Sequence, residues 1–206
     1  MLPSLRRLKH RRARRLDAPA KTIHASHRAR LPSAPILDIE ASGFGPSSYP
    51  IEVGLILPDG CTYCSLIRPL DAWTHWDASA EAIHHVARST LVAHGRSPAD
   101  VAHALNLRLH GQTIYCDAWY HDFTWLGRLF DAADLPQLFR LEDIRSLLGE
   151  TDMEVWHATK TDILAELGLQ RHRASNDARV LQQTLLRVKG WTAPIPAEAQ
   201  PCDRPV

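Results

Sequence analysis

The order of its apolar segments constrains the fold of this chain more than any other feature. The first three are short runs over residues 34–40, 51–57 and 61–67, and a Pro-Asp-Gly turn separates the second from the third. Their length and turn residues predict three strands, two of them joined as a hairpin. Helical patterns and one further strand follow. Strands that give way to mixed helices and strands predict an α/β fold, with one mixed sheet flanked by helices in a single domain.

The later segments supply the helices. Residues 79–86 predict a short helix, residues 98–109 a longer one with Pro98 in its first turn, and residues 113–116 a strand after Gly111. Three further helices are predicted from apolar residues at helical spacing. They are marked by Phe123, Leu126, Phe130 and Ala133; by Ile163–Leu167, which closes at Gly168; and by Ala178, Leu181, Leu185 and Val188, opened by Asn176.

The two ends of the chain differ in composition from its body. Residues 1–31 contain ten Lys or Arg and one acid, so this segment carries +9 and the remainder −8, although the net charge is only +1. We expect a flexible basic arm over residues 1–32, a folded domain over 33–192 and a Pro-rich, extended tail over 193–206. Three interpretations of the arm remain open: a nucleic-acid tether that neutralises phosphates, an inert solvated extension, or an Arg-rich targeting peptide.

Composition excludes several classes of protein. Hydrophobic residues make up 45% and charged residues 23% of the chain, as in globular domains. The longest apolar runs are far shorter than the ~18 residues of a membrane helix, and no apolar block follows the basic N-terminus as in a signal peptide. Four cysteines in a chain that can build its own core indicate a reducing compartment. We therefore expect a cytoplasmic protein with no membrane partner.

The first group of candidate functional residues is a pair of acids at the end of a predicted strand. Asp38 and Glu40 are two residues apart, so the alternation of a strand directs both carboxylates to the same face. Two acids at the end of a buried strand repel each other unless a cation or solvent relieves them. The pair therefore indicates either a site for a hard divalent metal ion or a solvated acidic turn.

Two further clusters lie where a helix begins. Asp122 is in the first turn of a helix that follows the strand over residues 113–116, and His172 and Asp177 flank the start of the last helix. Taken singly, each acid is explained by the helix dipole, and Ser175 or Asn176 by helix capping.

Taken together, the three clusters resemble the three exonuclease motifs of the DEDDh family of 3′-to-5′ exonucleases. The family includes the proofreading epsilon subunit of bacterial DNA polymerase III, ribonuclease T and oligoribonuclease. The motifs read here as Asp38-x-Glu40, then Asp122, then His-x-Ala-x-x-Asp-Ala from His172, and the likeness extends over about residues 34–190. It departs from the family at Ala41-Ser42 and at Asp117-Ala118, which leaves Asp117 as the alternative to Asp122.

The resemblance implies a ribonuclease H-like fold and a phosphodiester hydrolase that uses two Mg²⁺ or Mn²⁺ ions. Its metal ligands would be four carboxylates, and a neutral His172 would take the proton from the attacking water. The substrate would be a single-stranded DNA or RNA 3′ end, released as nucleoside 5′-monophosphates. The expected ligands are Asp38, Glu40, Asp122 and Asp177, and the expected substrate-binding residues are Ser42, Phe44, His84 and Trp119.

A second interpretation belongs to a different class of protein. The chain could keep the fold for docking, as a catalytically weak nucleic-acid-binding or polymerase-associated module. Retention of all four acids and the histidine favours the enzyme. The sequence leaves open the choice between DNA and RNA, and between a homodimer and association with a polymerase.

Overall fold

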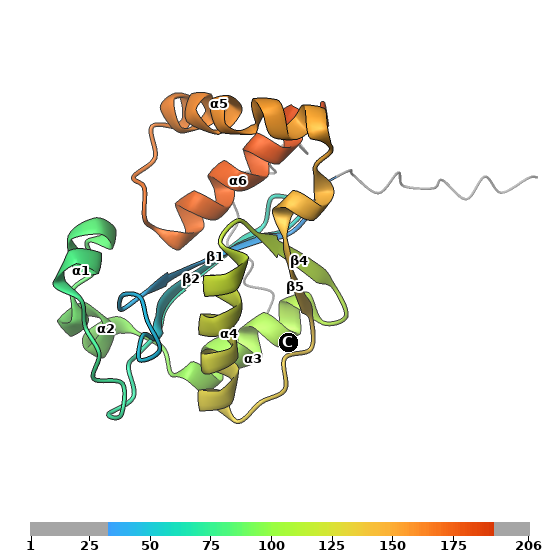
Figure 1. Cartoon of the computed structure of the whole chain (residues 1–206). Helices are drawn as coiled ribbons and strands as arrows, with labels where there is room; N and C mark the ends of the chain where they lie inside the picture. Colours follow the sequence, from blue (N-terminus) through green and yellow to red (C-terminus); the bar gives the residue numbers. More distant parts are fainter. Residues whose placement is uncertain (1–32, 192–206) are drawn as a thin grey trace, which may run out of the picture. The chain divides into compact units, whose positions relative to one another are not determined.

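The computed structural model describes residues 33–191, which form one mixed five-stranded sheet flanked by helices (Figure 1). The expected α/β fold is therefore confirmed. The basic arm and the Pro-rich tail expected from the sequence lie outside the described residues. The strands are β1 (Ile36–Ala41), β2 (Pro50–Ile56), β3 (Thr62–Leu66), β4 (Thr113–Cys116) and β5 (Arg140–Asp143).

Six α-helices and a short 3₁₀ helix accompany the sheet within the described residues. The 3₁₀ helix spans Ile144–Leu147 and follows β5 directly. None of the helices in residues 33–191 has the length and apolar composition needed to cross a membrane. The α-helices are α1 (Ala78–His84), α2 (Arg88–His94), α3 (Pro98–Leu109), α4 (Trp119–Ala133), α5 (Glu150–Leu167) and α6 (Ala174–Val188).

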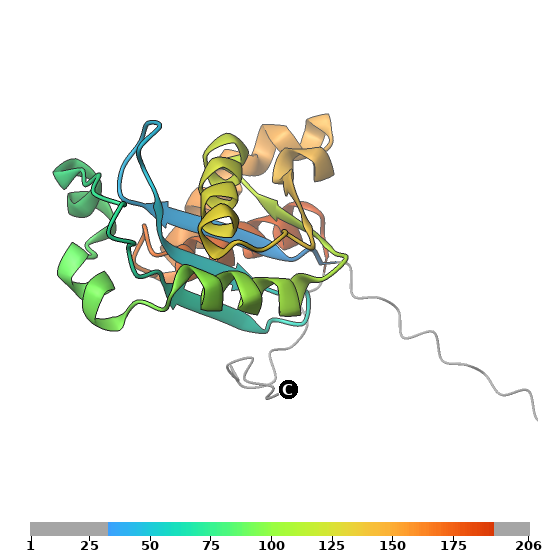
Figure 2. The same cartoon turned by 90° about the horizontal axis from the view of Figure 1, so that it is seen from below.

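The sheet has the strand order β3-β2-β1-β4-β5, and its pairing changes from antiparallel to parallel at β1. Strand β1 pairs antiparallel with β2 and parallel with β4, and β4 pairs parallel with β5. Helices α3 and α4 cover one face of the sheet, and α5 and α6 lie on the other (Figures 1 and 2). Because β1 and β4 run in the same direction, their carboxyl ends open onto one edge, where α/β folds commonly bind ligands.

Alternation along β1 separates its apolar and acidic residues. Leu37 and Ile39 join the core beneath α3 and α4, whereas Ile36 packs with residues of α6 in a second core cluster. Asp38 and Glu40 share the face of Ile36, as the period of a strand requires. The strand thereby anchors itself in both cores and presents its two acids beside the start of α6.

Three local expectations were wrong or incomplete. The sequence pattern missed α2 and β5, because β5 buries only Leu141 and both segments are short and polar. Helix α6 begins at Ala174 rather than at Asn176, and neither Ser175 nor Asn176 caps it. The helical spacing predicts that Phe123 is buried, but it is exposed, because the buried face of α4 includes Leu126 and Phe130 and not Phe123.

Gly54 on β2 generates a prediction about the contact between α6 and the sheet. A Cβ atom there would lie 2.1 Å from the carbonyl carbon of Ala174, too close for any real contact. We expect Gly54→Ala to lower the free energy of unfolding by about 1 to 3 kcal/mol, as overpacking does. Gly127→Ala is the control: it adds a Cβ to open space within α4 and should be neutral or mildly stabilising. Urea denaturation of both variants measures the difference, and equal stability would contradict the packing described.

Candidate active site

Strand β1 contributes two acids to the edge of the sheet where β1 and β4 end. Asp38 and Glu40 are both half-buried, and they pair with Gly54 and Glu52 across the β1–β2 ladder. The two carboxylates project from the same face, and the charge of Glu40 is one of the causes, after burial and Asp122, that raise the pKa of Asp38. Asp38 and Glu40 are therefore half-buried neighbours on one face of β1, and their role as metal ligands stays a prediction.

Asp122 lies in the first turn of helix α4, and its surroundings differ from those of Asp117. Asp122 is only 1% exposed, and its Oδ2 atom has no hydrogen-bond partner. Asp117 instead accepts a hydrogen bond from Lys160 Nζ at 2.6 Å, as part of an ion pair with α5. Asp122 thus has a buried carboxylate oxygen without a hydrogen-bond partner, whereas Asp117 is paired with Lys160.

The start of α6 contributes His172 and Asp177. The backbone N–H of His172 donates to Asp177 Oδ2 at 2.7 Å, and His172 itself has a left-handed backbone with φ of 58°. One potential ligand atom each from Glu40, His172 and Asp177 lie within 4.8 Å of one another. The first and third sequence motifs therefore meet in space, and the histidine stands among the acids.

The acids of this site have strongly perturbed protonation. Burial, followed by the charges of Asp122 and Glu40, raises the pKa of Asp38 well above its usual range. Burial and then the charge of Asp177 raise the pKa of Glu40 to about 7, and burial is also the main cause that raises the pKa of Asp122 to about 8. Burial raises the pKa of Asp177 as well.

The donor set fits hard divalent cations. It consists of carboxylate oxygens, which Mg²⁺ and Mn²⁺ prefer, and it includes the orphaned buried oxygen of Asp122. A cation at this position would relieve the repulsion and desolvation that raise the pKa values of the four acids. Glu40, His172 and Asp177 therefore form a candidate metal site between β1 and the start of α6, with Asp38 and Asp122 as acidic neighbours.

A cavity of about 180 Å³ adjoins the acids. It is lined by Glu40 and His172, by the end of β1 and the following Gly43-Phe44 turn, and by residues of α1. Phe44 is 65% exposed at the rim, with its ring 5.1 Å from that of His121. Phe44 is therefore not a core residue, and its contact with substrate stays a prediction.

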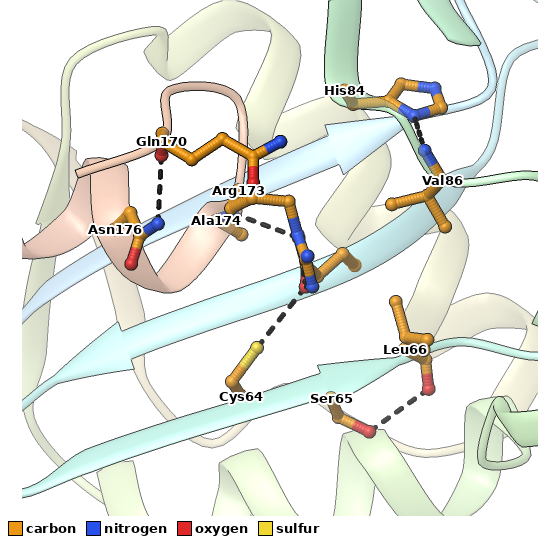
Figure 3. Close-up of polar contacts among 10 residues, drawn as sticks. Cys64, Ser65, Leu66, His84, Val86, Gln170, Arg173, Ala174 and Asn176 are labelled. Carbon is orange, nitrogen blue, oxygen red and sulfur yellow. Dashed lines mark hydrogen bonds and ion pairs between the residues drawn. The ribbon is translucent and has the colours of Figure 1, made fainter.

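His84 lines the cavity from α1 although it is almost fully buried. Its Nδ1 accepts the backbone N–H of Val86 at 3.1 Å, and its Nε2 has no partner (Figure 3). Burial lowers the pKa of His84, which favours the neutral imidazole. A neutral ring bonded through Nδ1 as acceptor carries its proton on Nε2, so His84 offers a donor without a partner.

Two other expected substrate residues do not line the cavity. The hydroxyl of Ser42 is buried, accepts the N–H of Tyr49 at 3.1 Å and lies 3.1 Å from His75 Nδ1. Trp119 is 37% exposed, stacks on Phe123 and donates its indole N–H to Leu141. Both lie outside the residues that line the cavity, and their contact with substrate stays a prediction.

Sequence reasoning missed part of the cavity wall. Trp125, Asp77 and Ile83 line it, and Trp125 is held by a 2.8 Å hydrogen bond from its indole N–H to Ser48. The signal for Trp125 was available, because it lies three residues after Asp122 on the same helix face. Nothing local marks Asp77, which also caps α1.

Neither a protein-family model nor a curated protein sequence matches this chain. The fold is that of exonuclease structures in the ribonuclease H-like class. Escherichia coli Exonuclease I bound to a dT13 oligonucleotide matches with a TM-score of 0.57 at 14% identity, over 75% of this chain and 41% of that one. Its zinc-bound complex with single-stranded DNA gives 0.55 at 15%, over 76% and 41%.

A moderately thermophilic Exonuclease I from Methylocaldum szegediense gives a TM-score of 0.52 at 14% identity, over 75% of this chain and 40% of that one. The present chain spans about two fifths of the length of the exonuclease chains it matches. At these identities, the likeness shows a shared fold.

The raised pKa values predict an unusual pH dependence of stability in the metal-free protein. Acids with folded-state pKa values near 7 and 8 bind more protons in the native than in the unfolded state between pH 4 and 8, so stability falls as pH rises through that window. In the presence of a chelator, Asp122→Asn should lessen this fall and be the more stable protein at pH 8, by about 1 kcal/mol or more.

Asp117→Asn is the matched control, because it removes a paired carboxylate five residues away. It should bring no gain in stability at pH 8. Urea denaturation at several pH values provides the measurement, and identical pH profiles for wild type and Asp122→Asn would refute the electrostatic picture.

Proposed function

We propose that this chain is a metal-dependent 3′-to-5′ exonuclease that releases nucleoside 5′-monophosphates from single-stranded DNA or RNA ends. One observation carries the proposal: ligand atoms of Glu40, His172 and Asp177 lie within 4.8 Å of one another beside a cavity, and the charges of Glu40, Asp122 and Asp177 act on the neighbouring Asp38. This is the set expected from the motif resemblance. The exonuclease structures of the same fold, several bound to single-stranded oligonucleotides, support the choice of substrate class.

The four carboxylates have the role of metal ligands. Asp38, Glu40, Asp122 and Asp177 would hold two Mg²⁺ or Mn²⁺ ions, which when bound supply Lewis-acid stabilisation of the phosphoryl oxygens and lower the pKa of water. Asp38 and Glu40 are held rigidly because they belong to a central strand of the sheet. The backbone N–H of His172 fixes the orientation of the Asp177 carboxylate.

His172 has the role of general base. A ring nitrogen of its neutral imidazole takes a proton from the water that attacks the terminal phosphodiester, and the leaving 3′ oxygen stays with the shortened strand. Its half-buried position among Glu40 and Asp177 lets it reach solvent and the acids alike. The four oxygen donors suffice for the ions, so the imidazole remains available for proton transfer.

The cavity has the role of receiving the terminal nucleotide. Phe44 at its rim offers an exposed aromatic face for stacking, and His84 Nε2 offers an unpaired donor in its buried wall. Trp119 and Ser42 lie outside the lining residues, so their effect on substrate would be indirect or involve nucleotides further along the strand.

A labelled-oligonucleotide assay tests the proposal. Pure protein is incubated with 5′-labelled single-stranded DNA or RNA of equal length, with Mg²⁺, Mn²⁺ or EDTA. We expect progressive shortening from the 3′ end with either metal, none with EDTA, and at least a ~10³-fold loss in Asp38→Asn with the fold retained by circular dichroism. Binding without any shortening would instead favour a catalytically weak binding module.

The same assay distinguishes the roles of Asp117 and Asp122, the two aspartates near the start of α4. Asp122→Asn should lower turnover by at least ~10²-fold because it removes a ligand, whereas Asp117→Asn should have a far smaller effect because it only breaks the pair with Lys160. Turnover numbers at saturating metal decide between them. A larger loss at Asp117 would mean that the wrong acid has been assigned.

Phe44 generates a prediction about substrate affinity. Stacking of a base on an aromatic ring contributes about 1 to 3 kcal/mol, so Phe44→Ala should raise KM for short oligonucleotides about 5- to 150-fold with a smaller change in kcat. Leu138→Ala truncates another exposed apolar side chain, outside the cavity lining, and should leave KM unchanged. An unchanged KM in Phe44→Ala would remove Phe44 from the substrate site.

A further inference from the structure

We infer that Glu52 and Arg173 form a buried clasp that positions His172 and Asp177 against Glu40; this inference rests on the function proposed above. Glu52 lies on β2 directly opposite Glu40 on β1, and its side chain is 0% exposed. Arg173 immediately follows His172 in the chain. Neither residue is expected to touch substrate, so their role is one of position.

Each hydrogen bond to the Glu52 carboxylate comes either from the start of α6 or from strand β3. Arg173 donates from Nη2 at 2.7 Å to Oε1 and from Nε at 3.1 Å to Oε2. The backbone N–H of Ala174 donates to Oε2 at 3.1 Å, and the Cys64 thiol on β3 donates to Oε1 at 3.5 Å. In Figure 3, Arg173 and Cys64 point toward one another across the strands.

The clasp also completes the start of α6. The first N–H groups of a helix have no partner inside it, and a side chain of the N-cap residue usually accepts one of them. The N-cap of α6 is Arg173, which makes no such bond. Glu52 accepts the N–H of Ala174 instead, so the cap comes from a different element and ties the helix end to β2.

Gly54 strengthens this connection from the next position on the same face of β2. The absence of a side chain lets the backbone of Ala174 and Ser175 lie directly on the strand. Glu52 therefore attracts the start of α6, and Gly54 provides the room for it. Together they define the distance between α6 and the strand that lies beside Asp38 and Glu40.

The clasp acts on His172 through its neighbour in the chain. A histidine with φ of 58° occupies an uncommon backbone region, which persists where the surrounding structure holds it. In that conformation its N–H reaches Asp177 Oδ2, and its ring stands within the Glu40 and Asp177 group. Holding Arg173 fixes where both groups lie relative to Glu40.

A purely stabilising role explains the pair poorly. Burying a carboxylate costs desolvation, and apolar replacements of buried ion pairs often give equal or greater stability. The Arg187–Glu166 pair, which joins α6 to α5, is exposed and touches none of the site residues. It therefore provides a control: an ion pair between the same two residue types that has no contact with the active site.

The test compares Glu52→Gln, Arg173→Lys and the control Glu166→Gln with wild type. Mn²⁺ affinity is measured by calorimetry without substrate, kcat and KM on a labelled oligonucleotide, and the amide resonance of His172 by NMR. We expect both clasp variants to lose about 10- to 100-fold in Mn²⁺ affinity and in kcat, with KM unchanged, as for groups that orient metal ligands. The His172 amide signal should shift in both, and Arg173→Lys should be the milder variant.

Several results would overturn the clasp. Wild-type Mn²⁺ affinity and kcat in both folded variants would do so, as would equal losses in Glu166→Gln. If one clasp variant fails to fold, the other decides, and if both fail to fold, the pair is a folding requirement and the inference is wrong. Failure of the wild-type protein to bind Mn²⁺ or to shorten any strand defeats the proposed function instead, and the His172 amide shift still reports on the clasp.

Discussion

Mutual repulsion among carboxylates in a partly buried space is the constraint on which the rest of this structure depends. Burial disfavours the charge on Asp38, Glu40 and Asp122, and each charge raises the cost of the next, which moves the pKa of Glu40 to about 7 and that of Asp122 to about 8. Such a cluster persists only where rigid elements hold it. A central strand and two helix starts supply that rigidity, and a divalent cation would remove the cost.

The topology explains why these elements meet. Strands β1 and β4 are parallel, so the acids at the end of β1 and the helix that follows β4 share one edge of the sheet. Helix α6 approaches the same edge from the opposite layer to α4, and Gly54 lets it lie on the strand. The cavity then forms between this edge and α1, with Glu40 and His172 among its lining residues.

Local sequence could predict the parts of the site that depend on local geometry. Period-two alternation was enough to put Asp38 and Glu40 together, and the order of the segments was enough for the α/β fold. Contacts between distant residues were out of reach. The ion pair that occupies Asp117 depends on Lys160, 43 residues away, and the cap at Ala174 of α6 depends on Glu52, 122 residues away. Short polar elements such as α2 and β5 carried no periodic signal.

Calorimetric titration of Mn²⁺ into the chelator-treated protein at pH 7, repeated in two buffers of different ionisation enthalpy, tests the central claim that this cluster is built for divalent cations. Two ions per chain should bind, and binding should release protons, because Glu40 and Asp122 are partly protonated before the ions arrive. Asp38→Asn should abolish the tighter event. Absence of binding, or binding that is equally tight in Asp38→Asn, would contradict the assignment of these acids as a metal site.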